Sequence, residues 1–434
     1  MRLRRIGYLR YGLLWLALLL STVSGAGAQE TRHVDVLEIE GPVTPIMISY
    51  IERGIETSEA NGAEALIIKL DTPGGQIDLM ADIVQALLRA DVPVVVYVYP
   101  PGAYAASAGT LITLAGHVAA MAPGTTIGAA SPVGTQGEDL GETMETKVKE
   151  DLKAQARALA DRRGEDASAW AESAVEEAKA ATAAEALELG VIDFVAGDLD
   201  DLLDQMDGFE VEVNGRAVVL QTADAVVSDQ PMSFIEQFLH IITNPTVAFI
   251  LLTVGVNAIL YELSSPGGYV AGVVGAICLL LAFYSLGVLP VNYTGLILIG
   301  LAFVLFAVDL IASTHGVLTV GGIAALVAGA LLLFNSPLYR VSIVAVVTVA
   351  LVTGLFFAFA LTKVMQARKK PTVTGKEALV GSLAETRTRL DPDGKVFLKG
   401  ELWHAVATDG PIAARETVEI VEVDGFRLHV KKAS

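Results

Sequence analysis

The chain has 434 residues, of which 53% are hydrophobic and 18% are charged, so it is too apolar for a soluble protein and too long for a single domain. Its 49 acidic and 30 basic residues give a net charge of −19, which argues against a nucleic-acid partner, because phosphate binding needs clustered lysine and arginine. The one cysteine, Cys278, lies in an apolar run, and a single thiol excludes an intrachain disulfide or a four-cysteine zinc site. We therefore expect a protein that is partly embedded in a membrane.

Residues 1–28 have the features of a secretory signal peptide. Three arginines lie within Met1–Arg5, an apolar stretch follows over about Gly12–Val23, and residues 26–28 (Ala-Gly-Ala) offer a small-residue cleavage site. An uncleaved anchor is the alternative interpretation. Both interpretations place the following sequence outside the cytoplasm.

Residues 29–232 form a predicted extracytoplasmic domain of acidic character. From Glu30 to Gln230 there are 36 acidic and 12 basic residues, a net charge of −24. Ala65–Leu70 reads as a buried strand that runs into a Pro-Gly-Gly turn at residues 73–75, and Ile77–Leu88 then has helical spacing. Such a turn leaves backbone N–H groups free to bind an incoming oxygen, although by itself it is most often only a turn.

A second unit repeats this arrangement. Val94–Tyr99 is a predicted buried strand, residues 100–102 (Pro-Pro-Gly) end it, and a helix starts within Ala105–Gly109. Ser107 would lie at the N-terminus of that helix with its hydroxyl open to substrate, and the N–H of Ala108 could bind an oxyanion. The alternative is that Ser107 caps the helix or permits close packing, and an isolated Ala-Ser-Ala-Gly favours that alternative.

Two features precede the membrane. Phe209–Leu220 predicts a hairpin whose Asn-Gly pair forms a type I′ turn. Phe234, Phe238, Ile241 and Ile242 form an apolar stripe, which favours an interfacial helix or a lead-in to the first span over a substrate groove.

Residues 233–363 form the predicted membrane domain, because only Glu262, Asp309 and Arg340 are charged between positions 244 and 362. The five expected spans, each near the ~20 residues that cross the hydrocarbon core, are Thr246–Leu263, Gly268–Gly287, Tyr293–Ala312, Gly316–Phe334 and Val341–Thr362. For Asp309, near the end of its span, we favour a side chain that reaches the interface over one that marks a functional path.

The number of spans and the flanking charge agree on the topology. Five spans that start outside end inside, and four basic residues between Lys363 and Lys370 follow the last span, as the positive-inside rule requires. We expect a multi-pass protein of the cell (inner) membrane whose C-terminal part is cytoplasmic.

Residues 371–434 predict a small all-β barrel. Short alternating stretches at Lys395–Leu398, Val418–Val423 and Phe426–Val430 are separated by Asp-Gly turn signals at residues 393–394, 409–410 and 424–425. Nine basic and ten acidic residues balance one another, so a nucleic-acid-binding use of the barrel has no electrostatic footprint.

The Pro-Gly-Gly turn followed 32 residues later by Ala-Ser-Ala-Gly resembles the Clp-protease/crotonase superfold, and specifically the membrane-bound serine proteases of the NfeD family, long form. The resemblance covers the whole chain, and the order of its parts is more specific than any one motif. It implies an α/β Clp/crotonase-like extracytoplasmic domain, a polytopic α-helical membrane domain and a small C-terminal OB-like β-barrel of five strands.

A serine nucleophile needs a base, and no histidine is well placed. His33 precedes the first strand, His117 is ten residues past Ser107, and the stretch 127–132, where a Clp-type enzyme carries its triad histidine, has none. The resemblance implies a Ser-Lys dyad, and its lysine matches Lys147. Composition alone would make Lys147 a solvated helix residue with two rivals on the same helix, Lys149 and Lys153, and only the family pattern selects it.

The mechanism that the resemblance implies is peptide hydrolysis without a metal or an organic cofactor. Ser107 attacks the carbonyl, Lys147 accepts and returns the proton, and the N–H groups of Gly75 and Ala108 stabilise the oxyanion. Burial can lower a lysine pKa from ~10.4 to ~7–8, where it can act as a base.

Two hypotheses follow. The first is a membrane-bound serine endopeptidase that cleaves apolar peptide segments, with a stomatin-like (SPFH) membrane protein as partner or substrate and a homo-oligomeric assembly, as the resemblance suggests. The alternative is a catalytically inert membrane scaffold that binds an SPFH partner. A crotonase-type acyl-CoA enzyme is disfavoured because coenzyme A is cytoplasmic while this domain is exported.

Overall fold

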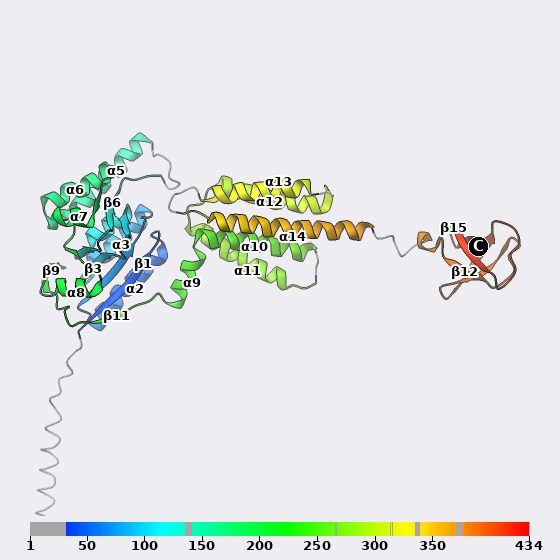
Figure 1. Cartoon of the computed structure of the whole chain (residues 1–434), viewed down its shortest axis with the longest axis horizontal. Coiled ribbons are helices and arrows are strands. Elements are labelled where there is room, and N and C mark those ends of the chain that lie inside the picture. The colour runs from blue at the N-terminus through cyan, green and yellow to red at the C-terminus, as the bar shows by residue number, and fades with distance from the viewer. Residues whose placement is uncertain are drawn as a thin grey trace, which may run out of the picture. The chain divides into compact units, whose positions relative to one another are not determined.

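The computed structural model describes residues 32–134, 141–264, 267–312, 314, 316–334, 339–369 and 376–433 (Figure 1). The predicted signal peptide lies outside these residues. The remaining elements follow the predicted order: an α/β domain, a set of apolar helices and a C-terminal β-barrel.

The α/β domain is built on a six-stranded parallel sheet with the strand order β11-β1-β2-β3-β5-β8. Its strands are β1 (His33–Glu40), β2 (Ala65–Asp71), β3 (Val94–Val98), β5 (Val118–Met121), β8 (Phe194–Val195) and β11 (Val226–Asp229). The predicted strands that precede the two glycine turns are therefore neighbours in one sheet. Both are buried on both faces, as continuous apolar runs in parallel sheets usually are.

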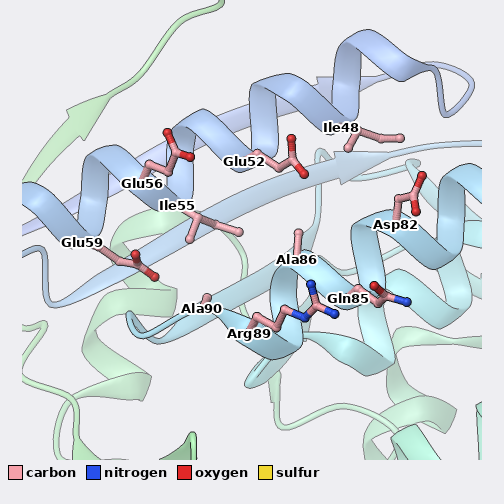
Figure 2. A pocket seen from close by; sticks show the side chains of 10 residues that line it. All are labelled: Ile48, Glu52, Ile55, Glu56, Glu59, Asp82, Gln85, Ala86, Arg89 and Ala90. Carbon is pink, nitrogen blue, oxygen red and sulfur yellow. The ribbon is translucent and has the colours of Figure 1, made fainter.

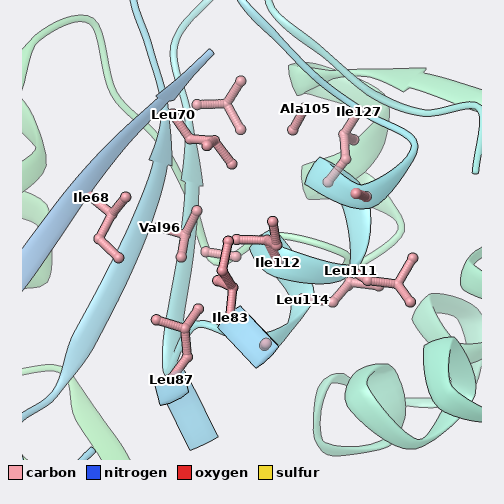
Figure 3. Packing of buried hydrophobic residues seen from close by; sticks show 14 of the residues in the cluster. Ile68, Leu70, Ile83, Leu87, Val96, Ala105, Leu111, Ile112, Leu114 and Ile127 are labelled. Carbon is pink, nitrogen blue, oxygen red and sulfur yellow. The ribbon is translucent and has the colours of Figure 1, made fainter. Parts of the chain in front are cut away.

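Helices cover both faces of this sheet. The helices of the domain are α2 (Pro45–Asn61), α3 (Ile77–Arg89), α4 (Ala108–Ala115), α5 (Glu142–Ala160), α6 (Glu165–Glu176), α7 (Ala183–Glu188) and α8 (Leu199–Met206), with a short 3₁₀ turn at Asp161–Arg163. Because successive strand residues point to opposite faces, Ile68 and its neighbour Ile67 belong to separate hydrophobic clusters. Figure 3 shows the first cluster, in which Ile68 and Val96 of the sheet pack with Ile112 of α4.

A second, three-stranded sheet leads into the N-terminus of α4. It contains β4 (Tyr104–Ala106), β6 (Thr126–Gly128) and β7 (Ala180–Thr182) in the order β4-β6-β7. Strand β4 ends directly before Ser107, and α4 begins directly after it. The helix expected within Ala105–Gly109 is therefore present, but its first two expected residues belong to a strand.

The predicted hairpin is confirmed. Strands β9 (Glu210–Val213) and β10 (Arg216–Val219) pair antiparallel, and positive φ angles at Asn214 (50°) and Gly215 (73°) are those that a type I′ turn requires. The Asn214 side-chain amide also donates to the carbonyl of Ala90, 3.1 Å away, and so fastens the turn to the end of α3.

Apolar helices occupy all five ranges that the sequence marked as spans. They are α10 (Pro245–Ser264), α11 (Val270–Val288), α12 (Tyr293–Ala312), α13 (Val317–Leu333) and α14 (Ile343–Lys369), preceded by the short α9 (Phe234–Ile242). Four of them, α10, α11, α12 and α14, are long and apolar enough to cross a membrane, while α13 has 17 residues. Small residues allow close packing between α10 and α11: a Cβ on Gly275 would lie 2.9 Å from the carbonyl oxygen of Gly255.

Asp309 does not extend into the interface as we expected. Its residue is only 1% exposed, and its carboxylate accepts hydrogen bonds from the Thr314 hydroxyl, the Gly316 N–H (3.3 Å) and both the N–H (2.9 Å) and hydroxyl (2.5 Å) of Thr319. The side chain turns back to cap the first turn of α13, because a helix start offers unpaired N–H donors that a carboxylate satisfies.

The C-terminal domain is a closed five-stranded barrel with the order β12-β13-β14-β16-β15. Its strands are β12 (Leu383–Thr386), β13 (Asp393–Leu398), β14 (Glu401–Ala407), β15 (Thr417–Asp424) and β16 (Arg427–Lys432), after a 3₁₀ turn at Lys376–Leu379. One expected turn is wrong: Asp393 and Gly394 lie inside β13 and pair with β14. A Cβ on Gly394 would lie 2.4 Å from Leu390 Cδ2, so close packing, and not a turn, requires this glycine.

Candidate active site

Ser107 occupies a strained position between β4 and α4. Its backbone has φ 53° and ψ −117°, which a non-glycine residue rarely adopts, and its N–H donates to the carbonyl of Gly128 at 2.9 Å. The side chain is half-buried, and its hydroxyl does not cap α4. A serine on a sharp strand-to-helix turn presents its hydroxyl outward, which is the arrangement of a nucleophile.

Thr72, directly before the Pro-Gly-Gly turn, is hydrogen-bonded to β4, the strand that ends directly before Ser107. The Thr72 N–H donates to the carbonyl of Tyr104 at 2.8 Å, and the Ala106 N–H donates to the carbonyl of Thr72 at 3.0 Å. The buried Thr72 hydroxyl accepts from the Gly74 N–H at 3.1 Å and so shapes the turn. The two motifs that lie 32 residues apart in the sequence therefore form one site.

Gly74 touches the serine so closely that no side chain fits there. A Cβ on Gly74 would lie 2.6 Å from Ser107 Cβ and 3.1 Å from the nitrogen of Ala108, and its φ is +105°. The next residue, Gly75, is bridged to Val43, whose N–H donates to the carbonyl of Gly74 at 2.9 Å. Within the described chain the N–H groups of Gly75 and Ala108 make no hydrogen bond, so both are free to donate. Ala108 directly follows Ser107, and Gly75 directly follows Gly74, the residue that contacts the serine.

Gly74→Ala is expected to lower kcat for peptide cleavage by ~10²–10³-fold, because the new Cβ would displace the serine and the N–H of Ala108. The matched control is Gly102→Ala, since Gly102 also has a positive φ (+93°) but nothing lies within 4 Å of its Cβ position. Steady-state kinetics on both full-length variants, with circular dichroism to confirm folding, separates the contact from the backbone strain that they share. Equal activity in the two variants would contradict the assignment.

Lys147 lies in the second turn of α5 and is exposed. The structure does not bring it to Ser107: no hydrogen bond or ion pair joins the two among the described residues, and residues 135–140, which lead into α5, are outside them. Its rivals are occupied. Lys149 pairs with Glu145 at 3.0 Å, and Lys153 pairs with Glu176 at 2.9 Å and Glu150 at 3.1 Å.

The ion pairs of Lys153 also oppose a role as base. Hydrogen bonds to Glu176 and Glu150 raise the pKa of Lys153 above its ordinary value, whereas a base near neutral pH needs a lowered pKa. Lys147 makes no such ion pair with the described residues.

His117 serves the opposite end of α4 and not the serine. Its Nδ1 accepts from the Val94 N–H at 3.0 Å, and burial, followed by the charges of Arg162 and Arg163, lowers the pKa of His117 to about 4. His33, the other histidine considered as a base, is the first residue of β1.

The two arginines, which sequence reasoning missed, hold the C-terminal carbonyls of α4. Arg162 Nη2 donates to Leu114 at 2.9 Å and also to Gly116, and Arg163 Nη1 donates to Leu114 at 3.1 Å. Arg163 also pairs with Asp193 at 3.1 Å. Burial lowers the pKa of Arg162 to about 10, so it stays charged at neutral pH and complements the negative helix end. An Arg-Arg pair 55 residues after the serine is the only sequence signal, and it is a weak one.

His117→Asn is expected to flatten the acid limb of the stability profile. The folded state prefers neutral His117, so its stabilisation is complete above the unfolded pKa of ~6.5 and is lost as the pH falls toward 4, by at most ~3 kcal/mol. Asn can still accept from the Val94 N–H. Thermal unfolding of the full-length protein at about pH 7 and about pH 4.5 measures the difference. The control is His404→Asn, because His404 is an exposed histidine of the barrel. If His117→Asn lost as much stability between the two pH values as the wild type, the prediction would be contradicted.

No group of three or more His, Cys, Asp or Glu side chains within the described ranges could hold a metal ion. A groove of about 440 Å³ between α2 and α3 is acidic: its lining includes Glu52, Glu56 and Glu59 of α2 and Asp82 of α3, with Arg89 on the α3 side (Figure 2). None of the residues proposed for catalysis lines this groove. The candidate site is therefore the region where the Pro-Gly-Gly turn meets Ser107.

The fold and site define a multi-pass membrane protein with a Clp/crotonase-like α/β domain and a C-terminal five-stranded barrel. Three family models match the chain: the NfeD1b N-terminal domain at residues 33–215, the NfeD integral membrane domain at 246–363, and the NfeD-like C-terminal, partner-binding domain at 376–432. The chain belongs to the NfeD family.

Two curated relatives match along nearly their whole length. Membrane-bound protease PH1510 of Pyrococcus horikoshii is 37% identical over 410 residues, which are 92% of each chain. Membrane protein NfeD1b of Bacillus subtilis is 28% identical over 429 residues, 93% of each chain. Among solved structures, the 1510-N membrane protease specific for a stomatin homolog from Pyrococcus horikoshii is 38% identical, covers 49% of this chain and 99% of its own, and has a TM-score of 0.43.

Proposed function

We propose that this protein is a membrane-bound serine endopeptidase in which Ser107 is the nucleophile and Lys147 the general base. The observation that carries the proposal is the half-buried Ser107, held at a positive φ directly before Ala108 and in contact with Gly74, the residue before Gly75. The N–H groups of Gly75 and Ala108 are free among the described residues. The match to a membrane-bound protease over 92% of both chains supports the same reaction class.

The reaction proposed is amide hydrolysis through an acyl-enzyme. Ser107 Oγ attacks the peptide carbonyl while Lys147 Nζ accepts its proton, and the two N–H groups bind the oxyanion. Lys147 then returns the proton to the leaving amine. Water, deprotonated by the same lysine, attacks the acyl group, and Lys147 gives that proton to the released Ser107 oxygen. Because Lys147 is exposed, the proposal requires the first turns of α5 to approach Ser107 during catalysis and to remove the ammonium from water, so that its proton affinity falls.

The substrate class proposed is an apolar peptide segment of a stomatin/SPFH-type membrane protein. The barrel matches a partner-binding domain. In a protease that acts on one partner protein, such a domain would bind that partner. We also propose a homo-oligomer, as is usual for proteases of this fold class.

The proposed topology places the protease domain outside the cytoplasm and the barrel inside. This needs an odd number of spans, so α13 must cross the membrane as a fifth helix. Its 17 residues are ~26 Å long, close to the ~30 Å of a hydrocarbon core.

The experiment incubates the full-length protein, in detergent, with an apolar peptide from a stomatin-type C-terminal segment. A parallel sample is treated with a fluorophosphonate, which attaches covalently to activated serines. We expect discrete cleavage products and a mass increase on the peptide that contains Ser107. An intact substrate together with an unmodified serine would contradict the peptidase proposal and favour the alternative, an inert scaffold that binds an SPFH partner.

A further inference from the structure

Helix α9, Phe234–Ile242, is amphipathic with its apolar side facing away from the protein. Four large hydrophobic side chains within its nine residues are exposed: Phe234 (83%), Ile235 (67%), Phe238 (42%) and Ile241 (51%). A surface helix of a soluble protein turns this side to the core. A contiguous apolar patch of this kind marks a contact with another surface.

The polar side of α9 faces the protein. Glu236, whose side chain is only 12% exposed, accepts two hydrogen bonds from Arg53 of α2, at 2.9 Å from Nε and 2.8 Å from Nη2. Arg53 Nη2 also donates to the carbonyl of Pro231 at 3.0 Å. This two-pronged pair fixes the rotation of the helix about its axis, so the outward direction of the apolar side is built into the structure.

The position of α9 in the chain indicates what covers the patch. A capping box between Ser233 and Glu236 starts the helix, and only Thr243 and Asn244 separate its end from the first membrane-spanning helix, α10. The 20 residues of α10 are ~30 Å long and so use the full thickness of the hydrocarbon core. Asn244 must then lie at the membrane boundary. Because α9 is only ~14 Å long and only two residues separate it from α10, every residue of this helix lies close to the membrane surface.

We propose that α9 lies in the lipid–water interface with Phe234, Ile235, Phe238 and Ile241 directed at the acyl chains, and that the Arg53–Glu236 pair attaches the α/β domain to this helix. A lipid surface fits better than a second copy of the chain because the patch is continuous with a membrane span. The net charge of −24 over residues 30–230 would repel an anionic membrane surface. An apolar contact, which does not depend on charge, can still hold this domain at the membrane. The interface does not depend on the proposed peptidase activity.

The test uses the full chain in lipid bilayer nanodiscs with Cys278→Ala, so that an introduced cysteine is the only thiol. A fluorophore is attached in turn to Phe238→Cys and to Gln237→Cys, an exposed position ~100° away around the same helix. Each label is exposed to a quencher fixed on the lipid acyl chains and, separately, to aqueous iodide. We expect the lipid quencher to act several-fold more strongly on the label at 238, and iodide to act more strongly on the label at 237.

Two outcomes overturn the proposal: a label at 238 that iodide reaches as easily as the label at 237, or one shielded from both quenchers, which would mean that protein covers the patch. A second measurement needs no substitution. Photoactivatable lipids crosslinked to the wild-type protein should leave adducts within Phe234–Ile242. Adducts on α10 without any on α9 would equally overturn the interface.

Discussion

Ser107→Ala is expected to abolish peptide cleavage by the full-length protein, with kcat/KM falling by at least ~10⁴-fold while the fold is retained. The substitution removes the proposed nucleophile and keeps the proposed oxyanion donors, the free N–H groups of Gly75 and Ala108. Folding should persist, because the Ser107 hydroxyl does not cap α4 and the backbone bond from Ser107 N to Gly128 is kept. The loss should therefore appear in kcat and not in the unfolding temperature.

The matched control for that variant is Ser173→Ala. The Ser173 hydroxyl donates to the carbonyl of Trp170 at 2.8 Å within α6, so its loss removes one structural hydrogen bond and no proposed catalytic group. Cleavage of the apolar peptide by each variant, followed by mass spectrometry, makes the comparison. A Ser107→Ala protein that still cuts at the wild-type rate would show that another group is the nucleophile.

Lys147→Ala is expected to reduce kcat/KM by ~10²–10⁴-fold at neutral pH, because a positioned general base contributes that much to proton transfer. Since Lys147 is exposed and makes no ion pair among the described residues, its removal should leave the unfolding temperature nearly unchanged. The same fluorophosphonate should also react more slowly with Ser107 in this variant, because the substitution removes the proposed base.

Lys149→Ala is the control for that prediction, because Lys149 lies two residues away on the same helix and pairs with Glu145. An exposed i,i+4 pair contributes only ~0.3–0.5 kcal/mol, so this variant should keep both its activity and nearly all of its stability. If Lys149→Ala lost activity while Lys147→Ala kept it, the proposed base would be the wrong lysine of α5.

Local patterns in the sequence were sufficient for the elements around the site. The continuous apolar runs that became β2 and β3 predicted buried strands, and the Asn214-Gly215 pair predicted the hairpin turn, because strand burial and turn geometry depend on neighbouring residues. Asp393-Gly394 failed by the same reasoning: an Asp-Gly pair usually marks a turn, but here the contact with Leu390 decides the role of the glycine.

The site itself was only half predictable. Ser107 and the Pro-Gly-Gly turn could be singled out because each follows a predicted strand, but the sequence could not show that Gly74 touches the serine. Lys147 could be selected over Lys149 and Lys153 only by family resemblance, since helical spacing treats the three alike. Among the described residues Lys149 pairs with Glu145 of its own helix, Lys153 pairs with Glu176 of α6, and Lys147 makes no ion pair; only the folded structure shows this difference.

The sequence by itself determined the division into an acidic N-terminal domain, a run of apolar helices and a C-terminal β-barrel with balanced charges, because hydropathy, charge and turn residues act over short distances along the chain. Only the tertiary structure decided which groups meet. The contact of Gly74 with Ser107, the burial of Asp309 and the outward apolar side of α9 each depend on how separate elements pack. The same residues in another packing would make other contacts, since side-chain orientation is set by the partner surface and not by the residue's own sequence neighbours.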